Sequence, residues 1–88
     1  MAHLAAGNPA AAVRRGEEAA RLFPAVAGIH YNLACAHARH GQPAPAVAAL
    51  AAAIQAGYRD RKSIQADPDL ESLHADPGYR KLIDALPE

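Results

Sequence analysis

The chain has 88 residues, 51% of them hydrophobic, and nine basic side chains balance nine acidic ones. This length predicts one small domain with a modest core, and the neutral charge argues against a nucleic-acid binder or a membrane-surface protein. The longest apolar run, residues 46–54, is too short to span a bilayer. A single cysteine, Cys35, forms no internal disulfide, and no secretory pattern begins the chain. We therefore expect a cytoplasmic protein.

The chain is predicted to be all-α, because alanine and leucine favour helix and no segment shows the period-two alternation with β-branched residues that is typical of a strand. A helical stub is expected over Met1–Ala6, ended by Gly7-Asn8. Three longer helices follow, each bounded by proline or glycine. Their expected ranges are residues 9–22, 27–39 and 43–56.

The last third of the chain differs from the rest, since it holds 12 of the 18 charged side chains within residues 59–88. Asp67-Pro68 and Asp76-Pro77 each place an aspartate at a helix N-cap and a proline at the first helical position. They predict short helices over residues 68–73 and 77–86, after another over 61–66. We interpret this segment as a helical cap.

The chain also matches itself at a shift of 34 residues. Residues 1–22 laid over residues 35–56 give 8 identities, among them His3 with His37, Gly7 with Gly41 and Val13 with Val47. A period of 34 is the length of a helix–turn–helix unit that stacks on copies of itself. Such units form binding surfaces far more often than active sites.

The segment Tyr31-Asn32-Leu33-Ala34-Cys35-Ala36, followed by Gly41, Ala46, Leu50 and Ala53, resembles one complete tetratricopeptide repeat. Residues 1–26 resemble the end of a preceding repeat, although Gly16 stands where Leu50 stands in the next one. The tail, with Gly57-Tyr58-Arg59-Asp60 and its two Asp-Pro helices, is similar to a bacterial group of C-terminal repeat ends. The resemblance implies an α-solenoid in one domain: a partial repeat (1–26), a complete repeat (27–58) and a cap (59–88).

The resemblance further implies a concave groove lined by the first helix of the complete repeat. On this sequence the lining residues are Gly28 and the partner-binding candidates Tyr31, Asn32, Cys35, Ala38 and Arg39. Asn32 matches an asparagine that in some family members holds the backbone or terminal carboxylate of a peptide, and Arg39 offers a cation to the same ligand. The implied function is a non-enzymatic module that binds a protein or peptide segment.

The residues themselves offer little catalytic or metal-binding chemistry. Cys35 and His37 are two positions apart on a helix and point in different directions, so they do not form a nucleophile–base pair. His37 and His40 share a helical face, with His30 two turns earlier, but no carboxylate or second cysteine near in sequence completes a ligand set. We predict no catalytic, cofactor-binding or metal-binding residues. A histidine-based metal site and a structural end-cap role remain the alternatives.

The N-terminal end poses a packing problem, because a repeat unit does not bury its apolar face alone. The helix over residues 9–22 is expected to present an uncovered surface that includes Val13, Ala20, Leu22 and Phe23. Either a longer array or a second copy of the chain would cover it, and a two-fold homodimer is the simplest closure.

Overall fold

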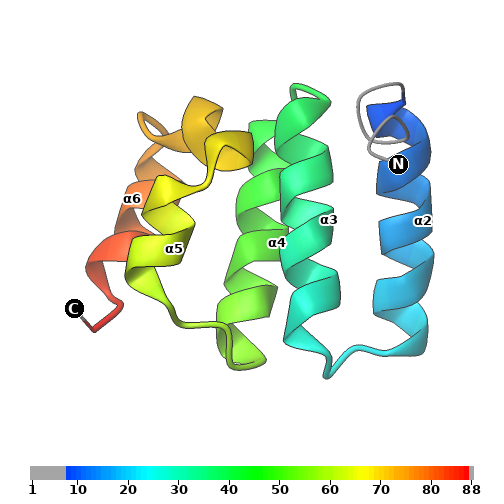
Figure 1. Ribbon diagram of the computed structural model, residues 1–88, viewed down its shortest axis with the longest axis horizontal. Coiled ribbons are helices and arrows are strands. Elements are labelled where there is room, and N and C mark those ends of the chain that lie inside the picture. The colour runs from blue at the N-terminus through cyan, green and yellow to red at the C-terminus, as the bar shows by residue number, and fades with distance from the viewer. Residues whose placement is uncertain (1–7, 88) are drawn as a thin grey trace.

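The computed structural model describes residues 8–87, which are all helix and connecting turns without a strand. Three long helices lie side by side and antiparallel, joined by short turns (Figure 1). They are α2 (Pro9–Leu22), α3 (Ala27–Arg39) and α4 (Pro43–Gln55). The expected stub over Met1–Ala6 lies outside the described residues. None of the helices within residues 8–87 is long and apolar enough to cross a membrane.

The helix boundaries follow from local chemistry that the sequence displays. Asn8 caps α2 by accepting a hydrogen bond from the amide of Ala11 at 3.0 Å, just ahead of a proline at the first helical position. Gly41 and Gly57 follow α3 and α4 with φ of 74° and 121°. Glycine takes these left-handed angles without steric cost, so both helices end where expected.

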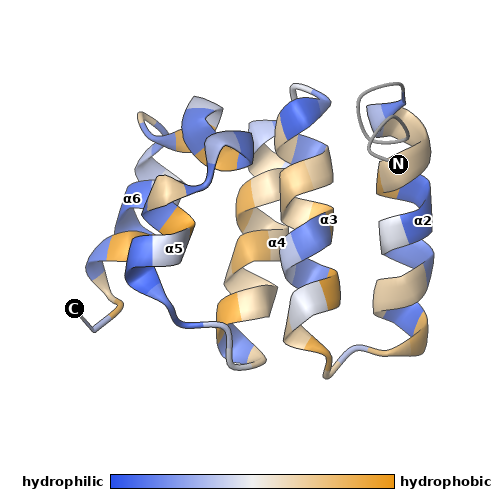
Figure 2. Cartoon of the chain, viewed as in Figure 1, coloured by the Kyte–Doolittle hydropathy of each residue, from blue (hydrophilic) through white to orange (hydrophobic). Residues whose placement is uncertain are grey.

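The core lies mainly between α3 and α4, which pack more extensively on each other than any other pair of elements. Ala46 and Ala53, two turns apart on α4, are fully buried, as is Leu50. Small side chains at the crossing let the two backbones approach closely, as expected from the sequence. Figure 2 shows the hydrophobic residues concentrated where α3 and α4 meet.

The C-terminal segment packs on one side of the α3–α4 pair (Figure 1). It comprises α5 (Arg61–Ala66), the 3₁₀ helix η1 (Pro68–Leu73) and α6 (Pro77–Asp84). The aspartate caps predicted for the last two helices are confirmed: Asp67 accepts from the amide of Asp69, and Asp76 from those of Gly78 and Tyr79. Three apolar side chains from this segment are fully buried, namely Ile64, Leu70 and Leu73.

On the other side of α3, α2 packs through small residues. A Cβ atom built on Gly16 would lie 2.9 Å from Cδ1 of Leu33, so α2 approaches α3 too closely for a side chain there. This contact explains why glycine stands where α4 has Leu50. Val13 is 8% exposed, so its expected place on an uncovered surface is wrong: it faces the core. Leu22 and Phe23, in contrast, are 65% and 56% exposed, as predicted.

Candidate functional site

The five predicted partner-binding residues all lie on α3, but they differ in accessibility. Asn32 and Arg39 are exposed and Cys35 is half-buried, whereas Tyr31 and Ala38 are buried. Burial results from η1, which packs against α3 and covers this part of its surface. The accessible part of the predicted set is therefore Asn32, Cys35 and Arg39.

Tyr31 is held by two partners that follow it in sequence. Its hydroxyl donates a hydrogen bond of 2.6 Å to Oδ2 of Asp67. Its ring meets that of Tyr58 edge-on, with centroids 4.4 Å apart. Burial and the hydrogen bond to Asp67 raise the pKa of the Tyr31 hydroxyl above its ordinary value. Tyr31 thus anchors the C-terminal segment to α3 and is not open to a ligand.

Asp67 has two roles, of which sequence reasoning found one. It caps η1 through the amide of Asp69 at 2.9 Å, as the Asp-Pro pattern predicted. It also accepts from Tyr31 on α3, a contact between residues 36 positions apart that the repeat pattern gave no signal for. The same carboxylate therefore fixes the start of η1 and ties it to the candidate surface.

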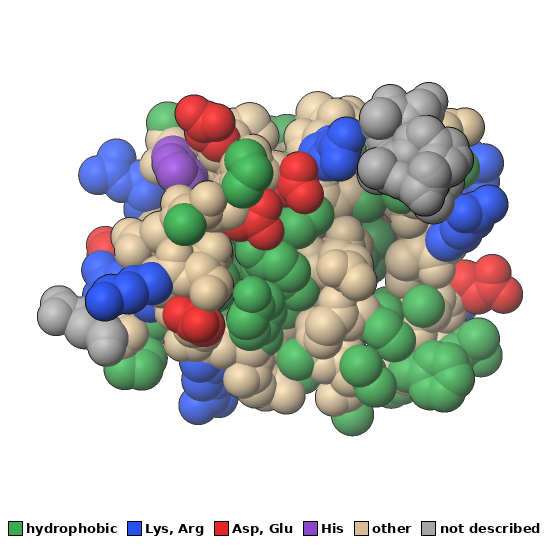
Figure 3. Space-filling model, viewed as in Figure 1, with side chains coloured by type: hydrophobic (Ala, Val, Ile, Leu, Met, Phe, Trp, Pro, Cys, Tyr) green, Lys and Arg blue, Asp and Glu red, His purple; other side chains and the backbone are tan. Residues whose placement is uncertain are grey.

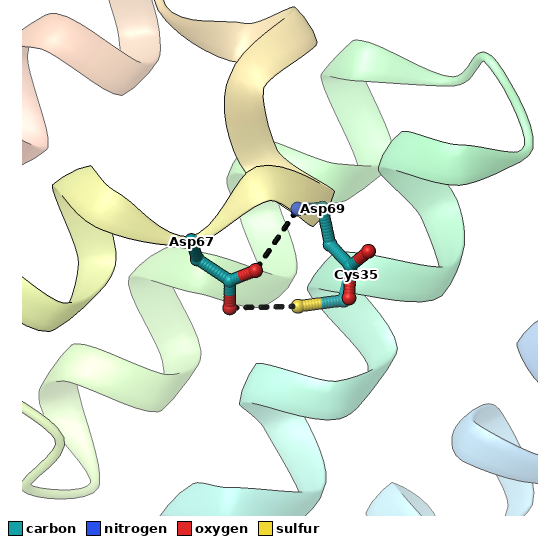
Figure 4. Close-up of side chains that lie close together, drawn as sticks. All are labelled: Cys35, Asp67 and Asp69. Carbon is teal, nitrogen blue, oxygen red and sulfur yellow. Dashed lines mark hydrogen bonds between the residues drawn. The ribbon is translucent and has the colours of Figure 1, made fainter. Parts of the chain in front are cut away.

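Cys35, Asp67 and Asp69 form a compact cluster at this junction, shown in Figure 4. The Sγ of Cys35 lies 3.9 Å from Oδ2 of Asp67, and one ligand atom from each residue falls within 4.8 Å of the others. Two carboxylates and a sulfur can in principle hold a cation. However, burial and the neighbouring carboxylates raise the pKa of the Cys35 thiol to about 12. The thiol is protonated at neutral pH, so it is a poor nucleophile in this setting.

A small cavity of about 190 Å³ opens beside this cluster, between α2, α3 and η1. A salt bridge closes one end: Nη1 of Arg39 lies 3.7 Å from Oδ1 of Asp69, and both side chains are about two-fifths exposed. The lining combines polar groups with small apolar ones, namely Pro9, Ala12, Asn32, Cys35, Ala36, Arg39 and Asp69. The cavity contains all three accessible members of the predicted set. Pro9, Ala12, Ala36 and Asp69 were not predicted, because only packing reveals which residues of α2, α3 and η1 face one another.

Acidic groups outnumber basic ones around this end of α3. Asp69 and Glu71 flank Arg39 on an adjoining surface hollow lined also by Ala38, Pro68 and Ser72. Asp67 adds a further carboxylate beneath Cys35. The cation of Arg39 is therefore already opposed by carboxylates. Such a site suits a ligand that offers hydrogen-bond donors or a positive charge better than one that offers a carboxylate.

The histidines have separate surroundings in the described part of the chain. His37 is buried, with Nδ1 3.2 Å from the side-chain oxygen of Gln42 and Nε2 3.9 Å from Glu17. His30 contacts the carbonyl of Pro24 at 2.7 Å, and His74 stacks on Tyr79. Within residues 8–87, the only cluster of three potential metal ligands contains no histidine.

Comparison with known proteins gives a narrow result. No protein-family model matches the chain, and no solved structure matches it significantly. The chain is similar to a chloroplastic protein of Arabidopsis thaliana, with 33% identity over 82 residues. The match covers 82% of this chain and 24% of the plant protein, so the chain spans about a quarter of that relative's length.

Proposed function

We propose that this chain is a non-enzymatic protein-interaction module of the tetratricopeptide kind, which binds a peptide or protein segment along the exposed face of α3. The observation that carries the proposal is the cavity between α2, α3 and η1, because it gathers Asn32, Cys35 and Arg39 at an accessible surface. The 34-residue self-match and the small residues at the α3–α4 crossing support the repeat-type arrangement.

The chemistry of the cavity favours binding over catalysis. Its one nucleophilic atom, the sulfur of Cys35, is protonated, because burial and the adjacent carboxylate of Asp67 raise the pKa of the thiol. The exposed amide of Asn32 can pair with the backbone of an extended segment through its donor and acceptor groups. The excess of carboxylates around Arg39 favours a segment with lysine, arginine or amide donors. A terminal carboxylate, which the family resemblance suggested, fits this end less well.

A structural role at the end of a longer repeat protein is the second candidate. The fully buried apolar side chains of α5 and η1 pack inward, while most of their polar residues face outward. A terminal unit of a stacked array needs this combination. The chain also corresponds to about a quarter of its plant relative, which is compatible with a domain that serves inside a longer protein.

An array of 15-residue peptides with free and with amidated C-termini tests the binding proposal. We expect the full chain to retain a subset rich in lysine or arginine, regardless of the terminal group, and to lose it after Asn32→Ala combined with Asp69→Asn, which removes a carboxylate from the cavity. Asp84→Asn is the matched control, since Asp84 is exposed on α6, away from the cavity. Equal retention by the double variant, or no retention by the unchanged chain, would count against the groove. Tyr31 is unsuitable for this test because it is buried.

A further inference from the structure

One side of α2, next to α3, is more open than the equivalent surface of α4. At the 34-residue shift, Ala12, Arg15, Gly16 and Ala19 of α2 correspond to Ala46, Ala49, Leu50 and Ala53 of α4. The α4 residues are at most 8% exposed and belong to the core that α3 covers. The α2 residues instead line an apolar cavity of about 360 Å³, together with Ile29, Asn32 and Ala36. The cavity is therefore a groove between α2 and α3, in which Gly16 lies against Leu33 while Arg15 is exposed.

Beside this groove, the exposed face of α2 carries a stripe with an unusual charge order. Ala11, Arg15, Glu18 and Leu22 are spaced i, i+4, i+7 and i+11, so they share one helical face, with Ala12 and Ala19 beside them. Arg15 and Glu18 are exposed, and Arg15 makes no salt bridge within residues 8–87. The stripe therefore combines small side chains, one cation, one anion and an apolar end.

The stripe is complementary in charge to a second copy of itself that runs in the opposite direction. In an antiparallel pair of α2 helices related by a two-fold axis between residues 16 and 17, Arg15 lies opposite Glu18 of the partner subunit. By symmetry, Glu18 lies opposite Arg15 of the partner subunit, and Leu22 covers the small Ala11 at each end. The same patch then serves both copies, which is the defining property of an isologous dimer interface. Ala12 and Ala19, beside the stripe, are small and leave room for the partner helix.

Exposed hydrophobic side chains continue the stripe at the turn between α2 and α3. Leu22, Phe23 and Val26 are 65%, 56% and 47% exposed, and they are the large hydrophobic residues most open to solvent in the described chain. Figure 3 shows hydrophobic side chains gathered at this end of the molecule. Apolar surface that adjoins a self-complementary charge pair is typical of protein–protein contacts.

We propose that the outward face of α2 binds α2 of a second copy of this chain, forming a two-fold dimer through Ala11, Arg15, Glu18 and Leu22. The dimer goes beyond the proposed peptide binding and does not depend on it, because its charged and apolar contacts lie on the outward stripe of α2. The cavity with Cys35 and Arg39 adjoins the stripe, and Asn32 lines both that cavity and the groove that Arg15 borders.

Sedimentation over a range of protein concentrations tests the dimer with the full chain. We expect a monomer–dimer equilibrium. Arg15→Glu is expected to raise its dissociation constant by more than about tenfold, since like charges then face each other across the axis twice. Arg14→Glu is the matched control: Arg14 is exposed on the same helix but lies off the stripe, so the same charge change leaves the dimer intact. Far-UV circular dichroism checks that each variant folds.

A charge exchange makes the test specific for the proposed pairing. Glu18→Arg alone is expected to be monomeric like Arg15→Glu, but an equimolar mixture of the two variants restores a heterodimer, because opposite charges then meet at both contacts. A chain that stays monomeric at every concentration would overturn the proposal, and the open face would then belong to a different protein. Equal dimerisation of the Arg14 and Arg15 variants, or a mixture that stays monomeric, would overturn it as well.

Discussion

Replacing Tyr31 with phenylalanine is the sharpest test of how the C-terminal segment is attached to α3. The substitution removes one oxygen and leaves the ring contact with Tyr58 in place. The 2.6 Å hydrogen bond to Asp67 is lost, and the carboxylate that caps η1 then has one fewer donor. Asp67 is half-buried, so water replaces that donor only in part.

Hydrogen bonds to charged groups contribute about 1.5–3 kcal/mol to stability. Because Asp67 keeps some access to solvent, we expect the lower half of this range, about 1.5–2 kcal/mol, for Tyr31→Phe. In a domain of this size, 1 kcal/mol lowers the Tm by about 4–8 °C, so the expected fall is roughly 6–16 °C. Urea unfolding followed by far-UV circular dichroism measures the change in free energy.

Tyr58→Phe is the control for this prediction, since the Tyr58 hydroxyl makes no hydrogen bond among the described residues. Its removal should change the free energy of unfolding by less than about 0.5 kcal/mol. Combining Tyr31→Phe with Asp67→Asn in a double-mutant cycle should give a coupling energy of about 1 kcal/mol or more. Asparagine preserves the cap, so the cycle isolates the link to Tyr31. Equal losses for the two tyrosine variants, or no coupling, would refute the proposed attachment.

Three further predictions concern the thiol, the glycines and a buried hydroxyl. The Cys35 thiol should reach half its maximal alkylation rate near pH 12 instead of 9.0. The thiol of the unfolded chain loses its proton at a lower pH than the thiol of the folded chain. The Cys35 contribution to the free energy of unfolding should therefore be complete below pH 9 and be lost as the pH rises toward 12. Cys35→Ala should reduce this dependence of the free energy of unfolding on pH. Gly28→Ala should stabilise α3 by about 0.5–1 kcal/mol, because nothing lies within 4 Å of the added Cβ. Gly16→Ala should instead destabilise the fold, because the added Cβ meets Leu33. Thermal unfolding measures both changes. The Tyr79 hydroxyl is buried without a hydrogen-bond partner among the described residues, so Tyr79→Phe should be neutral or stabilising by up to about 1 kcal/mol, and a clear loss would reveal a missed partner.

The sequence was most informative where structure is decided locally. Prolines, glycines and aspartate caps act within a few residues of themselves, and the helices begin at the predicted positions and end within two residues of the predicted ones. The expected final helix, for example, ends at Asp84 and not at Leu86, although Leu86 remains buried. The second of the three short elements is a 3₁₀ helix, a distinction that a six-residue segment does not reveal.

Long-range contacts were out of reach of the same reasoning. A face of α3 that looked like an open groove is partly filled because η1 turns back over Tyr31 and Ala38. Val13 was assigned to the surface on the assumption that α2 lacks a partner, yet it packs into the core beside α3. Gly16 marks that approach, but its meaning is visible only once Leu33 is placed opposite. Which face of a helix is covered depends on the neighbouring elements and not on the helix alone.

The most direct test of the central claim, that the exposed face of α3 binds a protein segment, is nuclear magnetic resonance of the full chain with a basic peptide selected from the array. Binding at the proposed site should shift the backbone and side-chain amides of Asn32 and the amides of Cys35 and Arg39, and leave those of α6 unchanged. The combined Asn32→Ala and Asp69→Asn variant, still folded, should show no such shifts. Shifts confined to α6, or shifts of equal size in the variant, would contradict the account.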